Sequence, residues 1–550
     1  MRTLTVCIAV FAIAFPIYGD EAARVVAPNG MVVSAETNAT HIGVAVLEQG
    51  GNAFDAAAAV GFALAVTYPA AGNIGGGGFC VGLKADGTAF AIDFREKAPA
   101  AASRDMYLDE AGEFVKGLST DTHLSVGVPG STAGLLMLLE EHGTLDRETI
   151  LEPVIRLARE GFRVNRTSSE RLKKNAAAKA VFFPGGEPLQ SGDRLVQPQL
   201  AQTLTAIADH GRDGFYTGRV ADLLVAEMKR HNGLITHADL RDYAPEKRTP
   251  FNVQEGPRTL VFMPPPSSGG VTIAQILGLL DLNALKAAGH GTAEYIHRVT
   301  EAERLAYADR NHFLGDPNDM EVELASLVSD DYLAERRKLI PHGKAGVSEG
   351  VNHGAPESEE TTHFTVVDQW GNVVAITYTL NSSFGSGILV EGAGFLLNNQ
   401  MDNFSAKPGV PNQYGLIGSK ANAVAPGKRM LSSMSPAIVT DEDGFAFTMG
   451  SPGGPTIITT VLQIYLNITL FDMTMTQAID APRVHHQWLP DLIQPEKGAL
   501  SEDVTNQLTA MGYAFRERPS IGRAEGIMRL ENGHVEGKTD RRAKGLALGH

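Results

Sequence analysis

The chain has 550 residues, more than one hydrophobic core usually fills, so the sequence predicts two or three domains or one large layered domain with insertions. Apolar residues make up 43% of the chain and charged residues only 20%, which excludes an intrinsically disordered protein. The 47 Lys and Arg against 63 Asp and Glu give a net charge of −16, which argues against nucleic-acid and anionic-membrane binding, because both need a basic surface.

The N-terminus has the pattern of a secretory signal peptide. Arg2 is followed by an apolar run over residues 6–17 and then by Gly19, a small residue before polar sequence. This run is shorter than the roughly 20 residues of a membrane-spanning helix. We therefore predict a signal peptide at residues 1–19, a periplasmic or secreted protein and no membrane span in the mature chain; the alternative is an uncleaved anchor. Cys80 is then the remaining cysteine, so no internal disulfide is expected.

The next segments predict a buried helix and a β-hairpin. Residues 53–67 are apolar nearly all round, which is typical of a helix inside a core. Residues 79–94 contain two apolar runs around an Asp-Gly turn, the pattern of a hairpin. Arg95 follows at once and could point into a cleft or form a surface salt bridge. Sequence alone favours the salt bridge.

The middle third of the chain reads as helices with polar joints. A long helical pattern begins at Ala293. The segment PPPSSGG at residues 264–270 predicts a rigid turn followed by a helix, with the serines as caps. Residues 342–360 have almost no apolar side chains, so an exposed, mobile linker is expected there.

A second hairpin follows the linker, with its turn at residues 369–372. If Asp368 pairs with Val373, Thr361 lies opposite Leu380. A slip of one residue would instead make Thr361 and Thr379 cross-strand neighbours. A third hairpin follows at residues 437–450. Strands near both ends of the chain, separated by helices, predict an α+β fold with helical layers over central sheets.

Thr361 stands at the junction between this linker and a buried-type strand. Cleavage of the bond between Glu360 and Thr361 would give the threonine a free α-amino group beside its own hydroxyl. A neutral amine can act as the base for that hydroxyl, the arrangement of an N-terminal threonine nucleophile. The alternative is an ordinary β-branched strand residue.

Further residues supply the parts that acyl transfer needs. Consecutive glycine N–H groups can face a developing oxyanion, hydroxyls and amides donate hydrogen bonds, and an arginine can clamp a carboxylate. The candidates are Arg95, Asn381, Gln400, Ser432, Ser433, Gly453 and Gly454.

The motifs in and around these residues are GNIGGGGF, DFREKAP, PPPSSGG, TTHFTVVD, TYTLNSSFGSG, LLNNQMDNFSAKPG, LSSMSP, GSPGGP and APRVHHQWLP. Together they resemble, over nearly the whole mature chain, the γ-glutamyltranspeptidases, also called γ-glutamyltransferases or glutathione hydrolases. The resemblance implies an N-terminal-nucleophile (Ntn) hydrolase with a four-layer αββα sandwich, formed jointly by two chains after self-cleavage. The large chain would be residues 20–360, including the exposed linker 342–360, and the small catalytic chain residues 361–550.

The same resemblance implies the reaction. Thr361 would cut the chain after Glu360 and then attack the γ-carbonyl of glutathione or another γ-glutamyl compound. The γ-glutamyl enzyme would pass its acyl group to water or to the amine of an amino acid or peptide. Neither a cofactor nor a metal is implied.

Roles for individual residues follow motif by motif. Thr379 would hydrogen-bond the nucleophile, and Gly453 and Gly454 would form the oxyanion hole. The donor's α-carboxylate would be held by Arg95, Ser432 and Ser433. Its α-ammonium would be held by Asn381 and Gln400. The segment after Phe404, with Tyr414, resembles the family's lid over the donor site.

One residue departs from the family pattern. The family has two aspartates after the methionine, whereas this chain reads Met401-Asp402-Asn403. An amide at residue 403 keeps a hydrogen bond to the donor's α-ammonium but loses the charge pairing, which predicts about 1–2 kcal/mol less discrimination for α-amino donors. Glutaryl cephalosporin acylases bind an acyl group without that amine, so glutaryl acylase activity is an alternative. The other alternative is that Gln400 and a water compensate.

Three other interpretations remain. Residues 346–350 match the G-x-S-x-G of esterases but lack its flanking strand and helix pattern. His485 and His486 could suggest a metal, but no third ligand lies at a recognisable spacing, which favours packing or hydrogen bonding. A non-catalytic periplasmic binding protein would need neither Thr361 nor the glycine pair.

Overall fold

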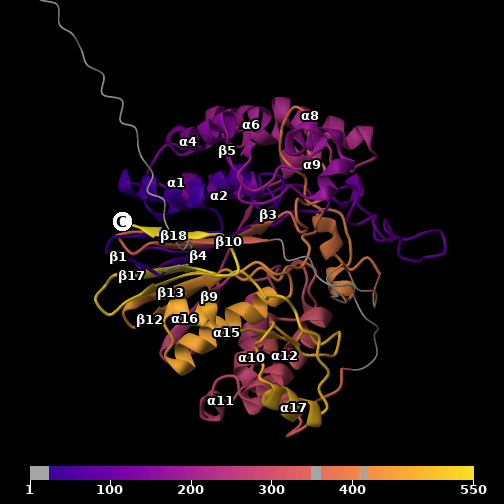
Figure 1. The fold of residues 1–550 in the computed structure, drawn as a ribbon. Helices are drawn as coiled ribbons and strands as arrows, with labels where there is room; N and C mark the ends of the chain where they lie inside the picture. Colours follow the sequence, from indigo (N-terminus) through magenta and orange to yellow (C-terminus); the bar gives the residue numbers. More distant parts are fainter. Residues whose placement is uncertain (1–23, 349–360, 408–409, 411, 414–417) are drawn as a thin grey trace, which may run out of the picture.

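The computed structural model describes residues 24–348, 361–407, 410, 412–413 and 418–550. Two seven-stranded antiparallel sheets lie face to face, with one helical layer over each outer face (Figure 1). The expected four-layer αββα sandwich is confirmed. The predicted signal peptide at residues 1–19 lies outside the described residues.

The first sheet lies under the α1–α6 helices. Its strands, in spatial order, are β18 (Leu546–Gly549), β2 (Met31–Ser34), β10 (Thr362–Val367), β11 (Val373–Thr379), β3 (Gly77–Leu83), β4 (Ala89–Phe94) and β7 (Glu246–Arg248). Those of the second sheet are β1 (Val25–Ala27), β17 (Val535–Thr539), β16 (Glu525–Arg529), β13 (Gly444–Gly450), β12 (Ala437–Asp441), β9 (Arg258–Phe262) and β8 (Phe251–Glu255). Both sheets therefore combine strands from before residue 349 with strands from after residue 360.

The helices divide between the two outer layers. On the first sheet lie α1 (Thr37–Glu48), α2 (Ala53–Thr67) and α3 (Ser131–His142), with α4 (Arg147–Glu160), α6 (Pro198–His210), α8 (Gly218–Arg230) and α9 (His237–Asp242) beyond them. On the second sheet lie α10 (Gly269–Leu279), α15 (Thr456–Phe471) and α16 (Met475–Asp480), with α11 (Leu282–Ala288), α12 (Ala293–Phe313), α14 (Asp330–Arg337) and α17 (Glu502–Ala510) around them.

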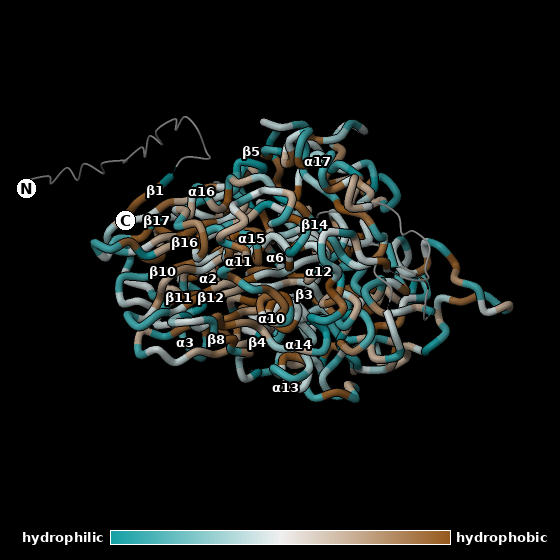
Figure 2. The backbone as a smooth tube through the Cα atoms, turned by 90° about the horizontal axis from the view of Figure 1, so that it is seen from below, coloured by the Kyte–Doolittle hydropathy of each residue, from teal (hydrophilic) through white to brown (hydrophobic). Residues whose placement is uncertain are grey.

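The two largest of the hydrophobic clusters among the described residues hold the layers together. Because strand side chains alternate between faces, Val374 and Ile376 of β11 pack against the α2 layer while Ala375 faces the second sheet. In Figure 2 hydrophobic segments gather in the interior, along α10 for example, and many peripheral loops are hydrophilic. The second core includes Phe447 and Met449 of β13, the strand that leads to the glycine turn.

Helix α2 confirms the predicted buried helix at residues 53–67, and all of its residues are buried. Asn52 begins it with a capping box, accepting hydrogen bonds from the N–H groups of Phe54 and Asp55. The hairpins predicted at residues 79–94 and 437–450 are also present, as β3–β4 and β12–β13.

The Pro-rich turn does precede a helix, but the predicted serine caps are wrong. Ser268 occupies the cap position of α10 without a side-chain capping bond. Its hydroxyl instead donates to the Ser432 carbonyl at 2.7 Å and accepts from Arg310 Nε at 2.9 Å. A tertiary contact therefore takes the hydroxyl that a local cap would have used.

The β10–β11 hairpin pairs Val367 with Val373, one residue away from the predicted pairing of Asp368 with Val373. The Asp368 carboxylate instead lies in the turn and accepts hydrogen bonds from the N–H groups of Trp370 and Asn372. The slip places Thr361 opposite Thr379.

The described part of the predicted linker is only partly exposed. Residues 342–344 are exposed, as expected. Ala345 donates its N–H to the Met511 carbonyl, however, and Ser348 is buried. Its hydroxyl accepts from Arg304 Nη1 at 2.5 Å, and its N–H donates to the Asp491 carboxylate at 2.7 Å. Hydrogen bonds attach these polar residues to the folded protein, and a count of apolar residues in the sequence does not predict such attachment. The rest of the linker lies outside the described residues.

Among the described residues, no single helix is long and apolar enough to cross a bilayer, and only the pair α10 and α11, bent by 75°, meets the length and composition test together.

Candidate active site

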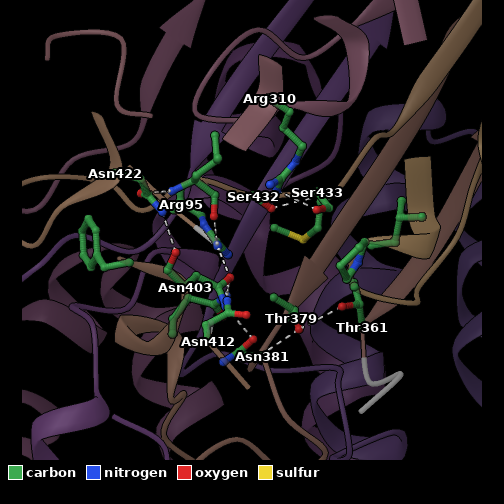
Figure 3. Close-up of a pocket in the computed structure, with 18 of the residues that line it drawn as sticks. Arg95, Arg310, Thr361, Thr379, Asn381, Asn403, Asn412, Asn422, Ser432 and Ser433 are labelled. Atoms are coloured by element: carbon green, nitrogen blue, oxygen red, sulfur yellow. Dashed lines mark hydrogen bonds between the residues drawn. The ribbon is translucent and has the colours of Figure 1, made fainter. Parts of the chain in front are cut away.

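A cavity opens where the ends of β10, β11 and β4 meet the turn before α15. Of the predicted site residues, it is lined by Arg95, Thr361, Thr379, Asn381, Gln400, Asn403, Ser432, Ser433 and Gly454 (Figure 3). Gly453 lies next to Gly454 in the same turn. Glu360 and Tyr414 lie outside the described residues.

Thr361 and Thr379 form a hydroxyl pair at the end of the hairpin. Thr361 Oγ1 donates to Thr379 Oγ1 at 3.2 Å, and the Thr379 hydroxyl also accepts from the N–H of Asn381 at 2.9 Å. Both threonines are buried, with 6% and 2% exposure. The position of the Thr361 hydroxyl is therefore fixed by strand register and by a neighbouring hydroxyl.

The glycine run at residues 75–78 allows this close packing. A Cβ on Gly76 would lie 2.1 Å from the Thr379 carbonyl oxygen, and one on Gly78 would lie 2.4 Å from Tyr378 Cβ. Side chains at these positions would push β11 away. The run therefore supports the strand that carries Thr379.

Gly453 and Gly454 lie between β13 and α15, both with positive φ, 136° and 56°. A Cβ on Gly453 would lie 2.4 Å from Thr456 Oγ1. Within the described part of the chain, neither glycine N–H donates to another protein group. Two adjacent N–H groups beside the first turn of a helix are suited to stabilise an oxyanion.

Arg95 is fully buried, so the surface salt bridge favoured by sequence is wrong. Its Nη2 donates to Asn403 Oδ1 at 2.7 Å, and its Nε donates to the Met430 carbonyl at 3.3 Å. The Glu96 carboxylate lies 3.4 Å from Nη1. Burial raises the pKa of Glu96 to about 7 although Arg95 opposes the shift. A partly protonated Glu96 leaves the positive charge of Arg95 available to an anionic ligand.

Asn403 links three polar side chains at the arginine side of the cavity. Its Oδ1 accepts from Arg95 and from Gln400 Nε2, each at 2.7 Å. Its Nδ2 donates to Asn381 Oδ1 at 2.9 Å. This pattern assigns the amide orientation, because two donors meet Oδ1. Among the described residues, Gln400 Oε1 is buried without a hydrogen-bond partner, which leaves an acceptor for a bound ammonium group.

Ser432 and Ser433 lie across the cavity from these amides. Ser432 Oγ accepts from the Met434 N–H at 3.1 Å, and Ser433 Oγ accepts from Arg310 Nη2 at 2.9 Å. Both hydroxyl protons therefore remain for a ligand carboxylate.

Arg310 is the main site residue that sequence reasoning missed. It is 3% exposed near the end of α12, and burial lowers its pKa to about 10. No ion pair joins it to a carboxylate among the described residues. Its guanidinium bridges Ser268 and Ser433, two segments far apart in sequence. It lies in a regular helical pattern, which gave no signal beyond the helix itself.

A family model described as Gamma-glutamyltranspeptidase matches residues 39–550. The chain belongs to the gamma-glutamyltranspeptidase family.

Similarity to individual proteins extends over nearly the whole chain. The "Glutathione hydrolase proenzyme" of Escherichia coli (strain K12) is 46% identical over 528 residues, covering 94% of this chain and 91% of that protein. A cephalosporin acylase of Bacillus halodurans superposes with a TM-score of 0.83 at 26% identity and covers 98% of this chain and 99% of its own. The Helicobacter pylori gamma-glutamyltranspeptidase shares 40% identity with a TM-score of 0.54, over 59% of this chain and 94% of that chain.

Two features that suggested other chemistry have structural explanations. Ser348, the serine of the esterase-like pattern, follows no strand and binds Arg304 and Asp491. His485 is buried between Thr459 Oγ1 and Gln487 Oε1, each 2.8 Å from a ring nitrogen. Burial lowers its pKa to about 3, so it stays neutral. This pair of hydrogen bonds fits the interpretation that favoured packing over a metal.

Proposed function

We propose that this protein is a self-processing γ-glutamyl hydrolase and transferase whose nucleophile is Thr361. The observation that carries the proposal is the Thr361–Thr379 hydroxyl pair, 3.2 Å apart, in a cavity that also contains Arg95 and Gly454. A binding protein has no use for a paired hydroxyl beside an oxyanion site. Family membership over residues 39–550 supports the same conclusion.

The first step of the proposal is cleavage between Glu360 and Thr361. The Thr361 hydroxyl attacks the Glu360 carbonyl carbon, the peptide C–N bond breaks, and the nitrogen takes up the proton. Water then hydrolyses the resulting ester, which leaves a Glu360 carboxylate and a threonine with a free amine and a free hydroxyl. The large chain would be residues 20–360 and the small chain residues 361–550.

In turnover the free α-amine of Thr361 takes the proton of its own hydroxyl as the oxygen attacks the γ-carbonyl of the donor. The oxyanion develops beside the N–H groups of Gly453 and Gly454. Collapse breaks the γ-amide C–N bond, and the leaving amine departs with that proton. Water or the amine of an amino acid or peptide then attacks the ester and restores the threonine.

The other lining residues are assigned to the donor. Arg95 and the hydroxyls of Ser432 and Ser433 would hold its α-carboxylate, since all three line the cavity and can donate hydrogen bonds. The acceptors Gln400 Oε1 and Asn381 Oδ1 would face its α-ammonium. Tyr414 is assigned to a lid by the family resemblance alone. The signal-like segment at residues 1–19 makes export to a periplasm or the medium part of the proposal.

The decisive experiment compares wild type with Thr361→Ala by intact mass and by sequencing the N-terminus of any short chain. Wild type should give two chains that divide between Glu360 and Thr361, and the variant one chain. The processed wild type should then hydrolyse γ-glutamyl p-nitroanilide. A single uncut chain in both, with ligand binding but no turnover, would instead indicate the binding-protein alternative.

A second candidate, glutaryl acylase activity in the same site, rests on Asn403. Its Oδ1 already accepts from Arg95 and Gln400, so a neutral amide, not a carboxylate, completes the arginine side of the cavity. Comparing γ-glutamyl and glutaryl anilides on wild type and Asn403→Asp tests it. The aspartate should shift the preference about tenfold toward the α-amino donor, as expected from about 1–2 kcal/mol. An unchanged donor ratio would show that residue 403 does not set donor choice.

A further inference from the structure

Three potential metal ligands converge at the C-terminal end of α8, in the helical layer over the first sheet. His123 begins the short 3₁₀ turn His123–Ser125, Glu227 lies in the last turn of α8, and His231 follows that helix. One ligand atom from each lies within 4.8 Å of the others. None of the three lines the active-site cavity.

The distances suit a small divalent ion. Glu227 Oε1 lies 2.9 Å from His123 Nε2 and 3.6 Å from His231 Nε2. Ligands about 2.0–2.1 Å from a tetrahedral metal are separated by roughly 3.3 Å, a value between these two distances. The imidazole rings stack with centroids 4.5 Å apart and an interplanar angle of 18°. Both imidazole nitrogens therefore lie close to the tetrahedral separation from the carboxylate, and the two imidazoles offer ligand atoms within 4.8 Å of each other.

Burial and hydrogen bonds fix the position of the Glu227 carboxylate. The Glu227 side chain is 4% exposed. Its Oε1 is in hydrogen-bond contact with His123 Nε2, and its Oε2 accepts from Arg230 Nη2. The His231 side chain is 53% exposed, which leaves a path for the ion and room for a water ligand.

We propose that His123, Glu227 and His231 bind a divalent transition-metal ion of the Zn²⁺ type. Two imidazoles and one carboxylate favour such an ion over Mg²⁺ and Ca²⁺, which prefer all-oxygen ligand sets. On binding, a metal–Nε2 bond replaces the hydrogen bond between His123 and Glu227. The Nε2 proton moves to Nδ1 of the ring or leaves to solvent. Two segments far apart in sequence supply the ligands, so local spacing gave no signal of this site.

Arg230 modulates the site. Its Nη2 lies 2.5 Å from Glu227 Oε2, so a positive charge sits next to the metal position. Replacement by glutamine removes the competing cation and leaves a neutral hydrogen-bond donor. Arg230→Gln should therefore tighten metal binding, a direction opposite to loss of a ligand.

The test titrates Zn²⁺ into tag-free, chelator-treated, processed protein by calorimetry, with Mg²⁺ as the comparison ion. Wild type should bind Zn²⁺ at an equimolar ratio and not respond to Mg²⁺. His231→Ala and Glu227→Gln should each weaken Zn²⁺ binding by about tenfold or more. His237→Ala is the matched control, because His237 and Asp222 form another histidine–carboxylate pair at 2.9 Å in the same layer.

Circular dichroism and donor hydrolysis check that each variant is folded. If Glu227→Gln fails to fold, His231→Ala still decides, because that side chain is half exposed. Loss of Zn²⁺ binding in His231→Ala with retention in His237→Ala supports the site. Absence of equimolar binding in wild type, or equal binding in His231→Ala, would show that the three residues only hydrogen-bond one another.

Discussion

The two ends of the active-site cavity are built by different interactions. At the threonine end, Thr361 and Thr379 lie on adjacent strands, and the backbone ladder of β10 and β11 sets their separation. At the arginine end, Arg95, Gln400 and Asn403 come from a strand end and a 3₁₀ turn, and side-chain hydrogen bonds hold them. The nucleophile therefore depends on sheet register, whereas donor recognition depends on single side chains that can change without moving it.

The largest effect is expected from breaking the threonine end. Thr379→Val keeps the β-branched shape but removes the hydroxyl that accepts from Thr361. We expect kcat to fall by about 10²-fold or more, since Thr379 positions the attacking hydroxyl and a displacement of about 1 Å at a reacting group can cost that much. The measurement is single-turnover donor hydrolysis on the processed fraction. Thr362→Val is the control: among the described residues its buried hydroxyl has no hydrogen-bond partner, so little change is expected. Equal rates for the two variants would contradict a role for Thr379.

At the arginine end, Arg95→Lys keeps the charge but loses the guanidinium geometry that meets a carboxylate. We expect KM for γ-glutamyl donors to rise by about 10- to 100-fold with kcat changed only a few-fold, in line with about 1.5–3 kcal/mol for a charged hydrogen bond. Donors that lack the α-carboxylate should show no such rise. A similar KM change for both donors would mean that Arg95 acts on the fold and not on the carboxylate.

The arginine end also contains Glu96, whose protonation should make the stability of the protein depend on pH. Burial raises its pKa from 4.5 to about 7, so the folded protein binds more protons than the unfolded chain between these values. The free energy of unfolding should therefore fall as pH rises, by about 2 kcal/mol between pH 5 and 7 from this group. Glu96→Gln removes that slope. Denaturant unfolding of both proteins at the two pH values measures it, and parallel pH profiles would refute the assignment.

The smallest effect is expected at Arg310, which reaches the donor only through Ser433. A lysine cannot span Ser268 and Ser433 with fixed geometry. Arg310→Lys should raise donor KM by about fivefold, from about 1 kcal/mol of lost hydrogen bonding, and leave acceptor KM unchanged. An equal rise in both constants would point to a general disturbance of α12.

Local patterns predicted most of the fold. The continuous apolar character of residues 53–67 predicted both ends of α2 correctly, and the turn residues predicted three hairpins. The pairing of Thr361 with Thr379 was within one residue of the predicted register, because Asp368 joined the turn and not the ladder. Such features depend on residues near one another in sequence.

Long-range features were not accessible in the same way. Arg95 was expected in a surface salt bridge, yet it is buried against residues more than 300 positions away, including Asn403 and Met430. Arg310 looked like any helical arginine, and Ser268 like an ordinary cap. Burial of a polar side chain depends on which distant segments pack over it, and neither periodicity nor propensity carries that information.

The mixing of early and late strands within each sheet has a consequence for the stability of the processed enzyme. In the first sheet β2, β3, β4 and β7 precede residue 349, while β10, β11 and β18 follow residue 360. Under the proposed cleavage, neither product could complete a sheet alone. Folding of the intact chain is unimolecular, but reassembly after denaturation would require two chains to meet, at a rate that falls with dilution. After cleavage, the two chains would thus not readily reassemble once unfolded. The lifetime of the active enzyme would then be set by its slow rate of unfolding.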